Sequence, residues 1–184
     1  MLHTAEAAVA ADDTDPLALT TLSWANVFAR RWDEILPPVE RAIELSPNFA
    51  PAIGLRGAAL AVLGEAEPAI ELVNQAIRLS PHDGFVAIWL MGVFWAYHAE
   101  GRYEEAIDVA QKAIRLAPNN PTFRRQLASA CALSGRMDEA RAALKDYLRL
   151  EPNHTIADAS KVPAKIQEHL DRFVDGLRIA GLSE

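Results

Sequence analysis

Apolar residues recur along this chain at the spacing of an α-helix. Ile70, Val73 and Ile77 lie three and four positions apart, and the same spacing returns within residues 107–114. Because a helix turns once in about 3.6 residues, such residues form one apolar stripe. The pattern predicts a series of amphipathic helices that bury their stripes against one another.

The helical pattern is interrupted at regular intervals. Four segments end in a leucine two residues before a proline, and these prolines lie 34, 37 and 34 residues apart. An Ala-Ile pair begins five residues before each of the first three prolines. Proline cannot continue a helix, so each marks the end of one unit and the start of the next. The four prolines are Pro47, Pro81, Pro118 and Pro152.

A second kind of interruption divides each unit in two. Gly64, Gly101 and Gly135 stand in the middle of three units, before acidic residues and an alanine, and Arg30-Arg31 takes this place in the first unit. Glycine ends a helix in the left-handed conformation without steric penalty. Acidic residues suit the positive end of the helix that follows. Each unit is therefore predicted to be two helices joined by a tight turn.

With these markers in phase over four copies, the chain resembles the tetratricopeptide repeat family across about residues 16–154. The resemblance implies an all-α fold, a right-handed superhelix of antiparallel helix hairpins, with repeats at 16–49, 50–83, 84–120 and 121–154. Arg56 and Phe94 depart from the family pattern, where a leucine and a small residue are usual. The residues that carry the resemblance are Leu19, Leu22, Val39 and Pro47; Ile53, Gly57, Leu60, Ala69, Val73 and Pro81; Leu90, Val93, Tyr97, Ala106 and Pro118; and Leu127, Ala128, Ala140, Leu144 and Pro152.

The third copy has three extra residues near Asp83–Val86. Phe85 to Trp95 is uninterrupted and rich in large apolar groups, so we expect the first helix of this copy to begin early and to run about one turn longer. The alternative is an insertion in the loop before it.

Both ends of the chain depart from the repeat. Residues 1–15 are predicted to supply only the second helix of a preceding partial repeat. Residues 155–184 are predicted to form a linker and an amphipathic helix over Ala164–Ala180, with Gly181 as its C-cap. This helix is expected to cap the last hairpin, and the alternative is a helix that binds a partner.

The tail also resembles the end of the repeat modules in bacterial class III adenylate or guanylate cyclases. The resemblance rests on residues 150–156 and 172–182. The basic stretch usual before the last helix is absent, since Ala157-Asp158-Ala159-Ser160 stands there. The resemblance implies a regulatory module of a bacterial signalling protein, and it lends no catalytic residue.

Composition narrows the classes of function. The 184 residues suit one domain, and the formal net charge is −7 without a basic stripe. Neutralising phosphates needs clustered Lys and Arg, so neither nucleic acid nor an anionic membrane is an expected partner. The longest apolar stretch, Phe85–Tyr97, is too short to span a bilayer. A single cysteine, Cys131, and the lack of a signal peptide pattern favour a cytoplasmic protein.

No catalytic or metal-binding pattern is present. The five histidines are scattered, none has the spacing of a convincing metal site, and no phosphate-binding glycine motif occurs. Cys131 falls where the family has a packing residue, so an inert thiol is expected. We predict that the chain is not an enzyme and needs no cofactor and no metal.

The predicted site is the concave surface, which in such folds is lined by the first helix of each repeat. Trp24 and Trp95 occupy equivalent places on either side of the second copy, although packing between hairpins could hide them. Only Arg125 could serve in a clamp for a terminal carboxylate, so no such clamp is predicted. The candidate groove residues are Trp24, Phe28, Ala58, Val62, Met91, Trp95, His98, Arg125 and Ser129.

An apolar groove with aromatic anchors suits an amphipathic helix or an apolar peptide segment. The sequence therefore predicts a scaffold that binds a protein or peptide. The alternative is self-association, in which a homodimer buries the groove or the N-terminal half-repeat.

Overall fold

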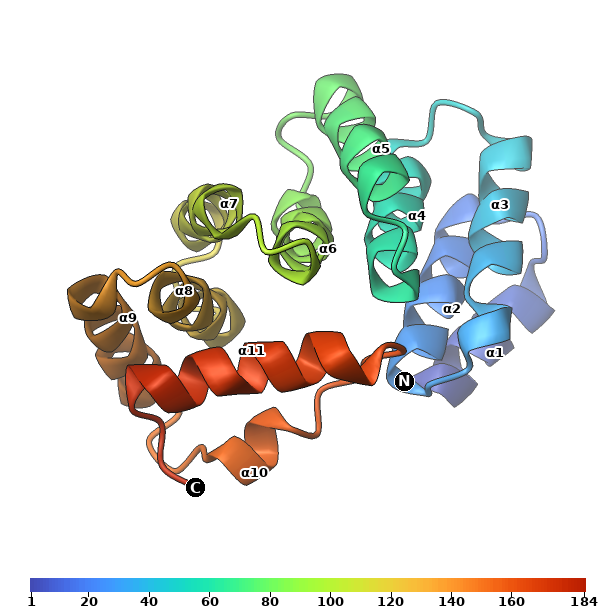
Figure 1. Cartoon of the computed structure of the whole chain (residues 1–184). Helices are drawn as coiled ribbons and strands as arrows, with labels where there is room; N and C mark the ends of the chain where they lie inside the picture. The colour runs from blue at the N-terminus through green and yellow to red at the C-terminus, as the bar shows by residue number, and fades with distance from the viewer.

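The computed structural model describes all 184 residues and contains helices but no strand (Figure 1). The fold is an all-α superhelix, as predicted. Its elements are α1 (Leu2–Ala11), α2 (Pro16–Phe28), the short 3-10 helix η1 (Trp32–Glu34), α3 (Leu36–Leu45), α4 (Ala50–Leu63), α5 (Ala66–Leu79), α6 (Val86–Ala99), α7 (Tyr103–Leu116), α8 (Pro121–Leu133), α9 (Met137–Leu150), α10 (Ile156–Ala159) and α11 (Gln167–Ala180).

Consecutive helices pack as hairpins, α2 with α3, α4 with α5, α6 with α7 and α8 with α9. The first helices α2, α4 and α6 also stack on one another, while α1 packs on α2. All four repeat prolines lie at junctions that follow the second helix of a hairpin, where the missing N–H and the fixed φ of proline do no harm.

The turns inside the hairpins use the left-handed backbone region. Gly64, Gly101 and Gly135 have φ of 94°, 73° and 84°. Arg30 takes the same place in the first hairpin with φ of 57°, the one non-glycine residue with positive φ in the chain. An L-residue is less favourable than glycine in this region because its Cβ approaches the carbonyl oxygen. The first turn is thus the strained member of the set.

The expectation for the third copy was wrong. Helix α6 begins at Val86 and has 14 residues, as many as α4. The extra residues lengthen the loop before it, where the Phe85 N–H donates to the Asp83 carboxylate at 2.9 Å. Aspartate and glycine in Pro81-His82-Asp83-Gly84 favour a turn, and this local chemistry outweighs the apolar run that follows.

Close contacts between hairpins depend on residues without side chains. A Cβ on Gly92 of α6 would lie 2.5 Å from the Cα of Ala58 in α4. A Cβ on Gly54 of α4 would overlap the indole ring of Trp89, which is fully buried. These contacts let α4 and α6 approach closely and bury both faces.

The C-terminal segment differs from its prediction. Helix α11 begins at Gln167, three residues later than expected, because Ile166 has an extended backbone with φ of −102° and ψ of 107°. Before it, α10 is one turn closed by a capping box between Thr155 and Asp158. We call residues Lys161–Ile166, the non-helical stretch between α10 and α11, the strap.

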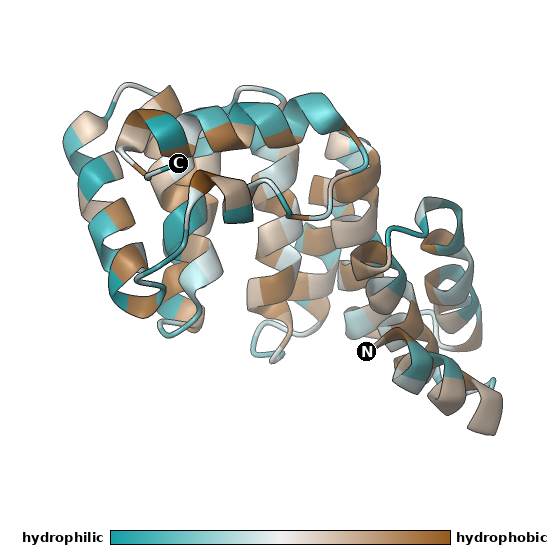
Figure 2. Cartoon of the chain, turned by 90° about the horizontal axis from the view of Figure 1, so that it is seen from below, coloured by the Kyte–Doolittle hydropathy of each residue, from teal (hydrophilic) through white to brown (hydrophobic).

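Helix α11 runs along the inner side of the superhelix (Figure 1). It packs chiefly on α8 and also contacts α6 and α9, whereas α6 and α8 hardly touch each other. Its apolar stripe is buried, with Phe173 and Leu177 fully inaccessible. The helix that leads to the C label in Figure 2 shows hydrophilic and hydrophobic residues in turn, as an amphipathic helix should. It thus covers the last hairpin from the concave side.

Candidate functional site

The concave face holds an open cavity of about 320 Å³, which we call the groove cavity. Its walls come from α2, α4, α6, the first turns of α8 and the strap. The lining is mostly apolar, and this suits an apolar guest with few polar groups. The lining residues are Trp24, Val27, Phe28, Val62, Ile88, Met91, Gly92, Trp95, Asn120, Thr122, Arg125, Val162 and Pro163.

Aromatic side chains mark two sides of the groove cavity. On α2, Trp24 and Phe28 are one turn apart and meet edge to face with ring centroids 5.4 Å apart. Phe28 is 48% exposed, a large fraction for phenylalanine. On α6, Trp95 is half-buried and packs on Phe173 of α11 at 4.7 Å. The α2 side is therefore the more accessible one.

The apolar surface continues toward the N-terminal end. A second, smaller cavity of about 90 Å³ shares Trp24 and Ile88 with the groove cavity. Leu17 and Phe85 line it and are 46% and 43% exposed. Covering exposed leucine and phenylalanine side chains with another apolar surface is favourable in free energy, because it removes them from water. The accessible apolar surface thus extends over the first helices of the first three hairpins.

Arg125 provides the one cationic group of the groove cavity. Its guanidinium lies 5.7 Å from the ring of Phe173 and 6.0 Å from that of Tyr147, and it forms no ion pair. Its Nε is buried without a hydrogen-bond partner, and burial lowers the pKa of Arg125 from its usual value. No lysine accompanies it in the cavity lining, where the other polar side chains are Asn120 and Thr122.

Three of the nine predicted groove residues have no accessible surface. Ala58 is covered by Gly92 of α6, while His98 and Ser129 lie beneath α11. The Ser129 hydroxyl donates to the Phe173 carbonyl at 2.9 Å, and the His98 Nε2 lies 3.1 Å from the Ser129 Oγ. With that hydroxyl proton committed, the His98 Nε2–H is the donor to Ser129. These three side chains belong to the buried interior of the fold and are not accessible to a bound peptide.

Burial decides the protonation of His98. It lowers the pKa of His98 to about 3, with smaller contributions from the positive charges of Arg172 and His169. The imidazole is therefore neutral at physiological pH, and its Nδ1 is buried without a hydrogen-bond partner. His98 thus contributes no charge to the groove.

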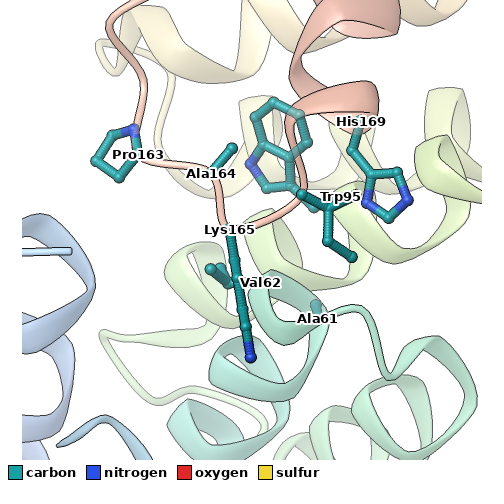
Figure 3. Close-up of a pocket in the computed structure, with 8 residues that line it drawn as sticks. Ala61, Val62, Trp95, Pro163, Ala164, Lys165 and His169 are labelled. Atoms are coloured by element: carbon teal, nitrogen blue, oxygen red, sulfur yellow. The ribbon is translucent and has the colours of Figure 1, made fainter. Parts of the chain in front are cut away.

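The other six predicted residues, Trp24, Phe28, Val62, Met91, Trp95 and Arg125, line the groove cavity. The sequence analysis missed the strap, whose Val162 and Pro163 complete the wall. Its residues Pro163, Ala164, Lys165 and Ile166 also line a smaller pocket together with Ala61, Val62, Trp95 and His169. Figure 3 labels seven of these eight residues. The only signal was a short apolar run, Val162-Pro163-Ala164, in a linker.

The structure shows no constellation that would support catalysis by a metal. No group of three His, Cys, Asp or Glu side chains gathers in a metal-binding arrangement. Cys131 is fully buried, and burial raises the pKa of its thiol to about 11, which keeps it protonated. No helix combines the length and the apolar character needed to cross a bilayer.

Comparisons with known proteins agree on the fold. A tetratricopeptide repeat family profile matches residues 97–161. No curated protein has a matching sequence. The solved structure of PilW, a type IV pilus biogenesis factor, is similar with a TM-score of 0.73 and 16% identity, over 97% of this chain and 79% of PilW.

Two further structures are similar over most of their length. YrrB, described as a tetratricopeptide repeat protein with an unusual peptide-binding site, gives a TM-score of 0.59 and 17% identity, over 98% of this chain and 97% of YrrB. TTC0263, a tetratricopeptide repeat protein of Thermus thermophilus, gives a TM-score of 0.62 and 24% identity, over 90% of this chain and 88% of TTC0263. At these identities the likeness establishes the tetratricopeptide fold. None of these three structures is a cyclase, and the resemblance of the tail to cyclase modules stays a prediction.

Proposed function

We propose that this protein is a non-catalytic scaffold whose concave face binds an apolar segment of another protein. One observation carries the proposal: the groove cavity is bordered by the first helices of all four hairpins and is lined by Trp24, Phe28, Met91 and Trp95. Aromatic and methionine side chains are enriched at protein interfaces, where they bury large apolar areas.

The lining limits the chemistry of the guest. Apolar residues dominate, and the polar groups are confined to Asn120, Thr122 and Arg125 at the α8 end. A highly charged peptide would lose its hydration without gaining partners in such a groove. An amphipathic helix or an extended segment with several large apolar residues meets the surface better. The solved structure of YrrB, with its peptide-binding site, supports a peptide as the guest.

The proposal can be tested without knowing the natural partner. A phage-displayed random peptide library is selected against the whole protein, and the affinity of the selected peptides is measured by fluorescence anisotropy. We expect apolar peptides, and we expect Phe28→Ser to weaken their binding about tenfold, as loss of an aromatic anchor does. Phe28 is half exposed, so this change should leave the fold intact.

The matched control is Gln75→Ser on α5, an exposed residue that lines none of the cavities described above. It should leave the affinity unchanged. If the selected peptides bind the Phe28→Ser and Gln75→Ser proteins alike, they bind elsewhere and the groove is not the site.

A second copy of the chain is the competing guest, since Leu17, Phe28 and Phe85 are all exposed near one end. Sedimentation velocity over a range of protein concentrations separates the two cases. A monomer supports the peptide groove. A dimer that Phe28→Ser dissociates would instead support self-association through this face.

A further inference from the structure

We infer that the strap competes with a partner for the concave face. A partner must displace the strap in order to bind along the full length of that face. This inference rests on the proposed function, because it concerns the regulation of the same groove. It starts from the path of the strap. The segment leaves the fourth hairpin, crosses the inner side of the superhelix and reaches residues of the first and second hairpins.

The strap occupies surface that would otherwise belong to the groove. Pro163, Ala164 and Ile166 line a small pocket together with Ala61 and Val62 near the end of α4 and Trp95 of α6. Figure 3 shows the path of the strap past Val62 and Trp95. Ile166 also sits against Gly64, where a Cβ would meet the isoleucine side chain. The strap thus already lies over the ends of α4 and α6, where a bound peptide would otherwise make contact.

The strap is held far more weakly than the helix that follows it. The backbone N–H groups of Ala164, Lys165 and Ile166 donate no hydrogen bond within the chain. The polar tie between the strap and the first hairpin is a bond of 3.2 Å from the Arg30 Nη2 to the Lys161 carbonyl. Val162 and Ala164 are partly buried against the core, so the strap is held by apolar contacts and by few backbone hydrogen bonds. Segments with few backbone hydrogen bonds open at low free energy.

Helix α11 provides the contrast. The Arg172 Nη1 donates to the Ala99 carbonyl at 2.6 Å, and Ser129 donates to the Phe173 carbonyl at 2.9 Å. Its apolar side chains Phe173 and Leu177 are fully buried. The strap can therefore leave the groove while α11 stays docked, and the boundary between them lies at Ile166.

The residue that ties the strap down is itself unusual. Arg30 adopts the left-handed conformation that glycine adopts in the other three hairpins. Its backbone is thus less favourable than that of the glycine which the other copies use, while its side chain supplies the bond to the strap. The unusual backbone conformation of Arg30 and the hydrogen bond to the strap therefore belong to the same residue.

The size of the groove explains why displacement matters. Val162 and Pro163 form part of the wall of the groove cavity, whose volume of about 320 Å³ accepts a few side chains. A helix with side chains is about 10 Å across and needs a longer trough. When the strap is open in only a fraction of molecules, the apparent affinity for such a guest falls by that fraction.

The test compares the whole protein with a strap-opened variant that carries Val162→Ser, Pro163→Gly and Ile166→Ser. The probe is the dye bis-ANS, which fluoresces on apolar surfaces, and a synthetic peptide of residues 160–168 serves as competitor. We expect the variant to bind the dye about tenfold more tightly than the wild type, as an open fraction of about one tenth implies. The peptide should displace the dye from the variant.

Two further variants sharpen the result. Arg30→Gly should raise dye affinity by a smaller factor, because it removes the polar tie and leaves the apolar contacts. Lys161→Ser removes only an exposed ion pair with Asp158 in the same segment, and should change dye affinity little because exposed ion pairs contribute little. Circular dichroism and thermal unfolding of each variant report whether the fold is retained.

Equal dye affinity in the wild type and the strap-opened variant would overturn the inference. A rise in dye binding that the peptide does not reverse, or that follows a loss of helix content, would also overturn it, because the dye would then report unfolding. If the strap peptide competes but no library peptide binds either form, the strap stands and the proposed function fails. If library peptides bind both forms equally, the proposed function stands and the strap does not compete.

Discussion

Residues at equivalent repeat positions on the concave face differ in how far they are buried. Trp24, Ala58, Trp95 and Ser129 occupy the same position in four successive first helices. Trp24 is half-buried beside the groove cavity, and Trp95 is half-buried beneath the strap and Phe173. Ala58 and Ser129 are fully buried, each against a glycine of another helix. The position in the repeat therefore sets the direction of a side chain, while the neighbouring element decides whether it reaches solvent.

The comparison shows that α11 covers the α8 end of the face, while α6 covers Ala58. Where α11 lies, at the α8 end, the concave surface has become core. Where it is absent, at the α2 end, Phe28 remains half exposed. Changes that remove α11 or its contacts should make the covered half resemble the open one, and their effects on stability can be ranked.

The largest effect is expected from Phe173→Ala. The ring is fully buried and contacts the rings of Phe94, Trp95 and His98. Its removal leaves a cavity under α11 and should lower the free energy of unfolding by about 4 kcal/mol. Urea unfolding followed by circular dichroism measures this. Ile179→Ala, at an exposed position on the same helix, should change it by less than about 0.5 kcal/mol. Similar values for the two variants would mean that α11 is not docked as described.

The second largest effect on the free energy of unfolding is expected from acidification. His98 is neutral in the folded protein because its pKa is about 3, against 6.5 for an unperturbed histidine. Below pH 6.5 the unfolded chain binds a proton that the folded chain excludes, so the free energy of unfolding falls as the pH falls, down to about pH 3. From about pH 7 to about pH 5, His98 alone should account for a loss of about 2 kcal/mol.

Burial also lowers the pKa values of His154 and His169, so their contributions have the same sign. The measurement is therefore a difference: urea unfolding of the wild type and of His98→Gln across this pH range. The slope of unfolding free energy against pH should be smaller in the variant. Parallel slopes would show that His98 is not the buried titrating group.

Ser129→Ala should lower the free energy of unfolding by an amount similar to that of acidification. The change removes the bond to the Phe173 carbonyl and leaves the His98 imidazole without its partner. A buried donor left unsatisfied lowers the free energy of unfolding by about 2 kcal/mol. Ser134→Ala removes a bond of similar length to the Cys131 carbonyl at a partly buried helix end, and should cost less than about 1 kcal/mol. Equal losses would show that the cover of α11 adds nothing.

The sequence predicted what local chemistry determines. Repeat prolines and turn glycines need no distant partner to act, and the register that they set put Trp24, Phe28, Val62, Met91, Trp95 and Arg125 around one cavity. The burial of Ala58 depends on Gly92, that of Ser129 on Gly176, and that of His98 on Phe173. These partners lie in other helices, so the sequence pattern around each residue does not reveal them. The strap escaped notice because it has no periodicity, and its place follows from the docking of α11.

The turn position of the hairpins offers the same comparison at the smallest scale. Arg30 and Gly101 are equivalent and both have positive φ, and a Cβ on Gly101 would meet no atom within 4 Å. Gly101→Ala therefore tests the backbone alone and should lower the free energy of unfolding by about 1 kcal/mol. Gly84→Ala is the matched control, because that glycine also has open space around it but no positive φ. It should leave stability unchanged or raise it slightly, since alanine restricts the unfolded chain. Should both changes have the same effect in thermal unfolding, left-handed strain is negligible in these turns, and the conformation of Arg30 loses its significance for the strap.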